Sequence, residues 1–190
     1  DTTESRKKYF KKTGFRLHDN SYGLYKEKKI FEAQETILKT NTLSVEDFKF
    51  FRFFHFLIQM MWSKKNYYYL LIFLKKNYDI HQVDFITDII ENIDVGEKIF
   101  DLYKNFMSDY EEAESFEKEE DLFSYWSKKE NFSRLEKGEY GKLNMLYTYK
   151  IILGMRDEFS NFLMKVLEKI KDKKNITDKN FEEKCKELLK

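Results

Sequence analysis

Apolar residues recur every three or four positions along most of the chain after residue 43, which is the spacing of one helix face. The densest run lies between Phe48 and Trp62, where all but four side chains are aromatic or aliphatic. The four polar residues are spaced three, three and four apart: Lys49, Arg52, His55 and Gln59. A polar stripe this narrow predicts a central helix that neighbouring elements must enclose. Ser44 and Asp47 form a near variant of the capping box and predict where it starts.

The same spacing predicts further helices at residues 64–76, 81–93, 97–110, 120–129 and 143–171, and a last one after residue 177. Gly138 and Gly141 mark a break before the longest of these, which we expect to bend at Gly154. The predicted fold class is therefore mainly α, an irregular bundle of about six or seven helices with a small N-terminal extended or β arm.

Residues 13–42 do not follow the helical pattern. Gly14 and Gly23 bracket the sequence HDNS, whose residues favour turns because Asp and Asn side chains can bond their own backbone. The flanking sequences GFRL, YGLY and KIFEAQETIL predict short strands or a hairpin, although FEAQETIL also suits a helix. We favour the extended form, which divides the chain into an arm at 1–42 and a helical bundle domain at 43–190.

Composition excludes several classes of protein. The chain has 190 residues, 42% hydrophobic and 36% charged, enough for one folded core. Charged residues interrupt every apolar run well short of the about 18 residues that a bilayer requires, so no membrane span is expected. The net charge of +1 predicts no nucleic-acid partner, because such binding favours a basic excess. The single Cys185 excludes an internal disulfide and suggests a reducing cytoplasm and an inert thiol.

No catalytic, cofactor-binding or metal motif is present in the sequence. Three histidines and one cysteine form neither HExxH nor CxxC, and the six glycines form neither a phosphate-binding loop nor a GxSxG elbow. The acidic stretch 109–121 has no DxDxDG calcium loop, and a solvated turn or helix surface explains it. Whether the chain belongs to an enzyme therefore stays open, and we expect no activity from this segment alone.

Two groups of polar residues are candidate contacts for a substrate or another domain. The first lies on the predicted helix and has the members Arg52, His55 and Gln59. It either meets solvent and satisfies backbone groups or faces a cavity or a partner. The second lies in the arm and has the members Arg16, His18, Asp19 and Asn20. It is either a hydrogen-bonded turn or a contact with substrate or a neighbouring domain.

Residues 13–62 carry a family likeness. The sequences TGFRLHDNSYGLY, KIFEAQETILKTNTLSVEDF and FFRFFHFLIQMMW together resemble the C-terminal region of radical S-adenosylmethionine proteins that carry an N-terminal cobalamin-binding domain. The resemblance implies an accessory helical domain that caps the catalytic barrel or docks a substrate or partner. It also implies that Arg16, His18 and Asp19 lie nearest the active site.

The cofactors implied by the resemblance belong to the parent enzyme. They are a [4Fe–4S] cluster and S-adenosylmethionine, with cobalamin left open. One cysteine cannot supply the three cluster ligands of CxxxCxxC, so this segment is expected to hold none of them. Because the chain begins with Asp1, we expect a fragment of a longer protein, whose partner is a catalytic domain of the same chain or another protein. The alternative is a stand-alone helical protein–protein interaction module that docks through the helix at 44–62.

Overall fold

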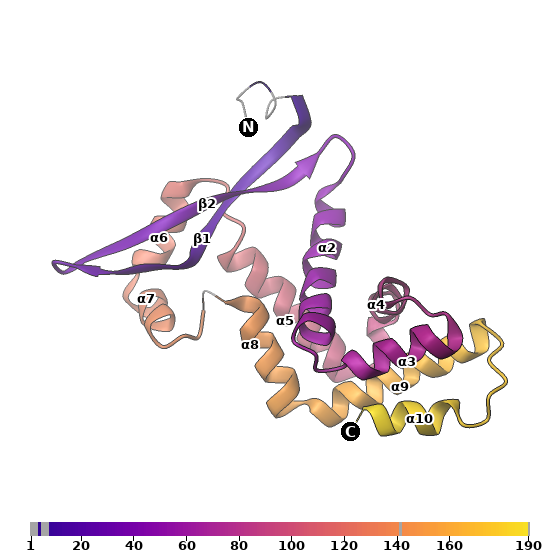
Figure 1. Ribbon diagram of the computed structural model, residues 1–190. Coiled ribbons are helices and arrows are strands. Elements are labelled where there is room, and N and C mark those ends of the chain that lie inside the picture. The colour runs from indigo at the N-terminus through magenta and orange to yellow at the C-terminus, as the bar shows by residue number, and fades with distance from the viewer. Residues whose placement is uncertain (1–3, 5–7, 141, 190) are drawn as a thin grey trace. The chain divides into compact units, whose positions relative to one another are not determined.

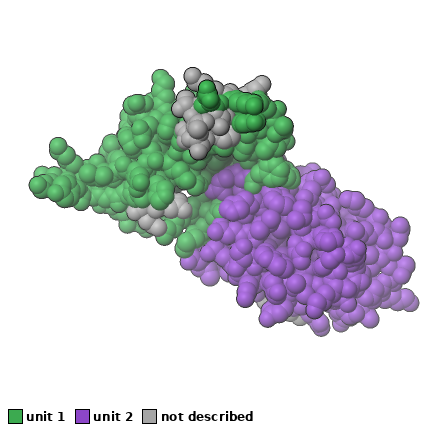
Figure 2. All heavy atoms as spheres, turned by 45° about the horizontal axis from the view of Figure 1, so that its top comes forward, with its two compact units in different colours: residues 1–51, 106–146 green, residues 52–105, 147–190 purple. Residues whose placement is uncertain are grey.

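The computed structural model describes residue 4, residues 8–140 and residues 142–189, without the side chains of residues 10, 11, 19 and 20. The fold is mainly α with a small N-terminal antiparallel sheet, which confirms the predicted fold class (Figure 1). The chain divides into two compact units (Figure 2). Unit 1 comprises residues 1–51 and 106–146, and unit 2 comprises residues 52–105 and 147–190.

The sheet of unit 1 is a long β-hairpin. Strand β1 (Phe10–Tyr25) pairs antiparallel with β2 (Lys28–Thr40), and a two-residue turn of Lys26 and Glu27 joins them. The extended conformation expected for FEAQETIL is confirmed, but the strands are longer than the short ones predicted. Exposed and half-buried residues alternate along residues 28–34, as expected for a strand with one covered face.

The covered face of the hairpin packs on α6 (Glu119–Ser127) and α7 (Lys129–Glu136). The buried part of this core contains Leu17, Ala113, Leu122, Trp126, Phe132, Leu135 and Tyr140. The hydroxyl of Tyr22 also donates a hydrogen bond of 3.1 Å to the carbonyl oxygen of Leu135. Helix α7 was not predicted, because its apolar positions are too few to establish a period.

Helix α2 (Val45–Ile58) starts at the predicted capping box. The Asp47 N–H donates to Ser44 Oγ at 3.0 Å, and the Ser44 N–H donates to Asp47 Oδ2 at 2.7 Å. The helix continues to Trp62 as predicted, but its last turn is the π-helical segment η1 (Gln59–Ser63). There the Lys64 N–H donates to the carbonyl of Gln59, which lies five residues earlier. The predicted enclosure is incomplete, since 47% of Phe51 is exposed.

Among its described residues, the regular secondary structure of unit 2 is entirely helical. It contains α3 (Tyr68–Tyr78), α4 (Gln82–Glu91), the 3₁₀ turn η2 (Ile93–Val95), α9 (Arg156–Lys173) and α10 (Phe181–Leu188). Helix α9 packs against α4, η2 and α10, and α3 packs against α4 and α10. The core face of α9 is formed by Phe159, Phe162, Leu163, Met164, Val166, Leu167 and Ile170.

Three helices have residues in both units: α2, α5 (Glu97–Ala113) and α8 (Leu143–Tyr149). The single helix predicted over 143–171 is not continuous. It is divided into α8, the π-helical segment η3 (Lys150–Gly154) and α9, and Met155 between them has a φ of −140°. The break lies beside the bend expected at Gly154. Among the described residues, no helix has the length and apolar character needed to cross a membrane.

Candidate functional site

The arm residues singled out in the sequence lie on β1 of unit 1. Arg16 is half-buried, and its Nε and Nη2 donate to Gln34 Oε1 at 3.1 and 2.8 Å. Gln34 is also the residue that pairs with Arg16 across the hairpin. The guanidinium is therefore positioned by a cross-strand contact on the outer face of the hairpin, which is the face opposite Leu17.

The sequence HDNS forms a bulge in β1. The neighbouring pairs are Leu17 with Ala33 and Tyr22 with Phe31, so His18–Ser21 lie opposite Glu32 alone. Leu17 and Tyr22 are five positions apart, and a regular strand would place them on opposite faces. Because both pack on the same core, the bulge is what brings them to one face.

The bulge was predicted as a turn between short strands, and that interpretation is wrong, since it lies inside one long strand. His18 is exposed, and its Nδ1 lies 2.8 Å from Ser21 Oγ, within hydrogen-bond distance. The side chains of Asp19 and Asn20 lie outside the described part of the structure. Their assignment as contact residues stays a prediction.

The helix residues singled out in the sequence lie in unit 2. Arg52 and Gln59 are half-buried, and His55 is exposed. They follow one another along α2 and η1 at the spacing of a single helix face. The three side chains therefore form one stripe along the helix. Their role as contacts with a substrate or another domain stays a prediction.

The tip of the hairpin, residues 23–30, was not singled out in the sequence. Three large apolar side chains are exposed there, Leu24 by 59%, Tyr25 by 63% and Ile30 by 50%. Tyr25 and Ile30 lie on the outer face together with Gly23, which pairs with Ile30. Beside Gly23 there is an open hollow of about 240 Å³, lined by Ser21, Tyr22, Gly23, Ile30, Phe31 and Glu32. In the sequence, the apolar pairs LY and IF flank the charged run KEKK, which contains none of the residues that usually mark a turn.

Contacts with α6 and α7 anchor the hairpin next to its tip. Lys29 Nζ donates to the carbonyl oxygen of Ser127 at 2.5 Å and lies 4.9 Å from the ring centroid of Phe132. The bond from Tyr22 ties β1 to α7, and the contacts of Lys29 tie β2 to α6 and α7. The tip extends past both helices (Figure 1), and it is the narrow projection at the left of unit 1 in Figure 2.

A tyrosine–carboxylate cluster lies beneath the hairpin in unit 1. Tyr140 donates to Asp109 Oδ1 at 2.8 Å, and Tyr125 donates to Glu112 Oε1 at 2.5 Å. The guanidinium of Arg134 lies 4.1 Å from the centroid of the Tyr140 ring. Burial and the hydrogen bond to Glu112 raise the pKa of Tyr125 to about 12, and burial with Asp109 raises the pKa of Tyr140 as well. These phenols are therefore neutral donors that hold α5 to α6 and to the loop after α7.

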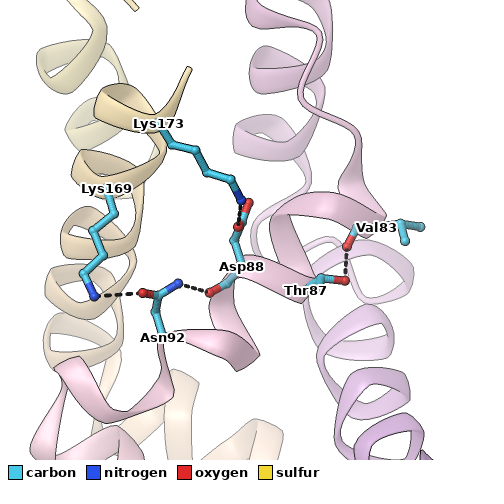
Figure 3. A network of polar contacts seen from close by, with 6 residues as sticks. All are labelled: Val83, Thr87, Asp88, Asn92, Lys169 and Lys173. Atoms are coloured by element: carbon cyan, nitrogen blue, oxygen red, sulfur yellow. Dashed lines mark hydrogen bonds and ion pairs between the residues drawn. The ribbon is translucent and has the colours of Figure 1, made fainter. Parts of the chain in front are cut away.

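Unit 2 contains a lysine ladder along α9 (Figure 3). Lys169 Nζ donates to Asn92 Oδ1 at 2.8 Å, and Lys173 Nζ lies 3.1 Å from Asp88 Oδ1. Asn92 in turn donates to the carbonyl oxygen of Asp88 at 2.8 Å. The hydrogen bond and charge of Asp88 raise the pKa of Lys173. The ladder places positive charge at the C-terminus of α4, where the helix dipole favours it, and it joins two helices.

An open hollow of about 990 Å³ also lies along α9 and the end of α10, lined by Arg156, Asp157, Ser160, Asn161, Met164, Lys165, Glu168, Lys186 and Leu189. Ser160 Oγ donates to the carbonyl oxygen of Leu189 at 3.2 Å, so this hydroxyl has a structural hydrogen bond. The lining contains neither His nor Cys that could activate a nucleophile. Acidic and basic side chains alternate along it, which is the ordinary character of a solvated helix surface.

Among the described residues there is no group of three or more His, Cys, Asp or Glu side chains that could hold a metal ion. Cys185 is fully buried, and burial raises the pKa of its thiol to about 12. Its sulfur is therefore protonated at neutral pH, whereas a metal ligand or nucleophile must be the thiolate. Comparisons of the chain with protein-family models, curated proteins and solved structures found no match.

Proposed function

We propose that this chain is a non-catalytic accessory domain of a radical S-adenosylmethionine enzyme and that it docks on the catalytic barrel through the β1–β2 hairpin. The observation that supports docking most directly is the exposure of Tyr25 and Ile30 on the outer face of the hairpin tip, together with that of Leu24 beside them. The stretch that resembles the family, residues 13–62, contains most of this hairpin and the whole of α2. The likeness is thus concentrated in one supersecondary element and the helix that follows it.

The chemistry is assigned to the barrel and not to this chain. Three cysteines would be needed to bind the [4Fe–4S] cluster, and the chain has one, whose thiol is buried with a raised pKa. The cluster, S-adenosylmethionine and any cobalamin would accordingly be bound by the rest of the enzyme. The contribution of this chain would be to cover the barrel or to hold a substrate against it.

The alternative is a helical interaction module with no connection to radical chemistry. Two exposed apolar residues of unit 2 favour it, Tyr149 by 55% and Leu153 by 81%. They are four positions apart, at the end of α8 and within η3, so they can present one small apolar surface. On this alternative the partner binds unit 2, and the hairpin is not required.

The coding sequence upstream of the Asp1 codon is the first test. A barrel with CxxxCxxC encoded there would support the accessory role. If neither that sequence nor the adjacent gene encodes such a barrel, the accessory role is wrong. The second test uses the chain itself. After anaerobic reconstitution with iron and sulfide we expect no cluster absorbance and no cleavage of S-adenosylmethionine. Either activity would contradict the non-catalytic assignment.

A further inference from the structure

The hairpin turn is built from residues that do not suit it. Lys26 and Glu27 have φ values of 47° and 65°, in the left-handed region. A two-residue turn with two positive φ values normally contains Asn and Gly, which adopt this region with little strain. The contact described for these side chains is that of Lys26 Nζ, 5.5 Å from the centroid of the Tyr25 ring. The packing of the described chain therefore does not explain why charged residues occupy the turn.

Gly23 is a second unsuitable residue a few positions away. Its φ is not in the left-handed region, and a Cβ built on it would meet no atom within 4 Å. The fold would accept an alanine or a valine, and either would favour the strand more than glycine does. A glycine inside a strand often marks a place where another chain approaches closely. Here Gly23 and the exposed Ile30, which pair across the hairpin, both line the open hollow.

Residue choices that break a local rule without benefit to the fold are expected at functional positions. Three such residues, Gly23, Lys26 and Glu27, lie within five positions at the end of a hairpin that Lys29 holds from below. We propose that the hairpin tip is the docking element and that it binds a protein surface of the catalytic domain, an inference that rests on the proposed function. An apolar side chain of that surface covers Gly23, and its carboxylates face Lys26 and Lys28.

The charges of the tip favour a protein as the occupant. Lys26 and Lys28 are exposed, and no carboxylate partner is described for either within the described residues. Glu27 lies between them at the apex, where an anionic bilayer would repel it. One aromatic ring and two lysines also fall short of the basic groove and stacking platform that single-stranded nucleic acids require. An apolar centre with charges of both signs around it is the usual composition of a protein–protein interface.

The test separates docking from stability. The polypeptide encoded upstream of the Asp1 codon is titrated by calorimetry with the 190-residue chain and with three variants. Gly23→Val fills the hollow, and Tyr25→Ser removes an exposed ring. Leu153→Ser is the matched control, because it removes an exposed apolar side chain from unit 2. Gly23→Val should unfold at the same temperature as the original chain or a higher one, since a Cβ added at this position meets open space.

We expect Gly23→Val and Tyr25→Ser each to weaken binding by at least about tenfold and Leu153→Ser to change it by less than about twofold. If the original chain binds and the two tip variants bind equally well, the tip inference is wrong and the accessory role stands. If the original chain does not bind, both the accessory role and the tip inference are wrong. Sedimentation with vesicles of phosphatidylserine and phosphatidylcholine that depends on Tyr25 would overturn the choice of a protein occupant.

Discussion

A methyl group at Gly14 has no room. A Cβ built there would lie 2.7 Å from Leu38 Cδ1 and 2.9 Å from the carbonyl oxygen of Phe116. Leu38 is a buried side chain that could shift, but the carbonyl is backbone. That oxygen also accepts a hydrogen bond of 2.7 Å from the Phe15 N–H, and the Phe116 N–H donates to the Phe15 carbonyl oxygen at 2.9 Å. Gly14→Ala must therefore push apart the bridge between β1 and the segment before α6.

The magnitude follows from three terms. Overpacking a filled site costs about 1–3 kcal/mol, and weakening the two bridge hydrogen bonds costs up to about 1 kcal/mol each. Replacing glycine by alanine at a compatible φ raises the free energy of unfolding by about 0.5–1 kcal/mol, because alanine has less conformational freedom in the unfolded chain. We expect Gly14→Ala to lower the free energy of unfolding by about 2 kcal/mol. Gly23→Ala, in the same strand but in open space, should raise it by about 0.5 kcal/mol.

Urea unfolding of both variants measures the difference. The chain has two tryptophans, Trp62 in unit 2 and Trp126 in unit 1. A Trp62→Phe background leaves Trp126, which is buried in the core under the hairpin, as the fluorescent reporter of unit 1. Far-ultraviolet circular dichroism provides a second probe of the transition. If Gly14→Ala proves as stable as Gly23→Ala, the close approach of β1 to Phe116 is refuted.

Three further predictions use the same unfolding assay or a thiol reagent. Asp47→Ala should destabilise the chain at about pH 7, and its effect should shrink as the pH is lowered. The reason is that hydrogen bonds from Ser44 lower the pKa of Asp47 below its ordinary value of 3.8, so the stability they provide is lost as the pH falls through the lowered pKa. An effect that does not change with pH would contradict the capping role. Cys185 should react with an aromatic disulfide reagent only as fast as the native protein unfolds, and it should react completely in urea, because burial raises the pKa of its thiol to about 12. Rapid reaction of the native protein would show an accessible thiolate. Lys26→Asn with Glu27→Gly should raise the free energy of unfolding by about 1–2 kcal/mol, because both φ values are positive; a decrease would refute the strained turn.

The helices could be predicted from the sequence because their signals are local. The capping box at Ser44 and Asp47 is formed within four consecutive residues, and it lies where the pattern placed it. Helix α7 shows the limit of this reasoning. Its buried Phe132 and Leu135 become informative only once they meet the hairpin, because two apolar positions do not define a period.

The candidate site could be predicted only in part. Arg16 and His18 were identified from the composition of the arm, but the contact of Arg16 with Gln34 depends on strand register, which the sequence does not specify. The turn was missed because Lys26 and Glu27 are not turn residues. The composition of HDNS predicts a turn, whereas the shift in strand register between Leu17 and Tyr22 makes it a bulge.

The sequence by itself determined the position of most helices and the start of α2, since hydrophobic period and capping act between residues a few positions apart. Only the tertiary structure decided how the strands pair, which residues the bulge brings to the core and which side chains stay exposed at the hairpin tip. These features depend on contacts between residues distant in sequence, such as those of Phe15 with Phe116 and of Lys29 with Ser127. Such contacts form when the covered face of the hairpin is buried against α6 and α7, because that burial selects one register among those the strands alone would allow.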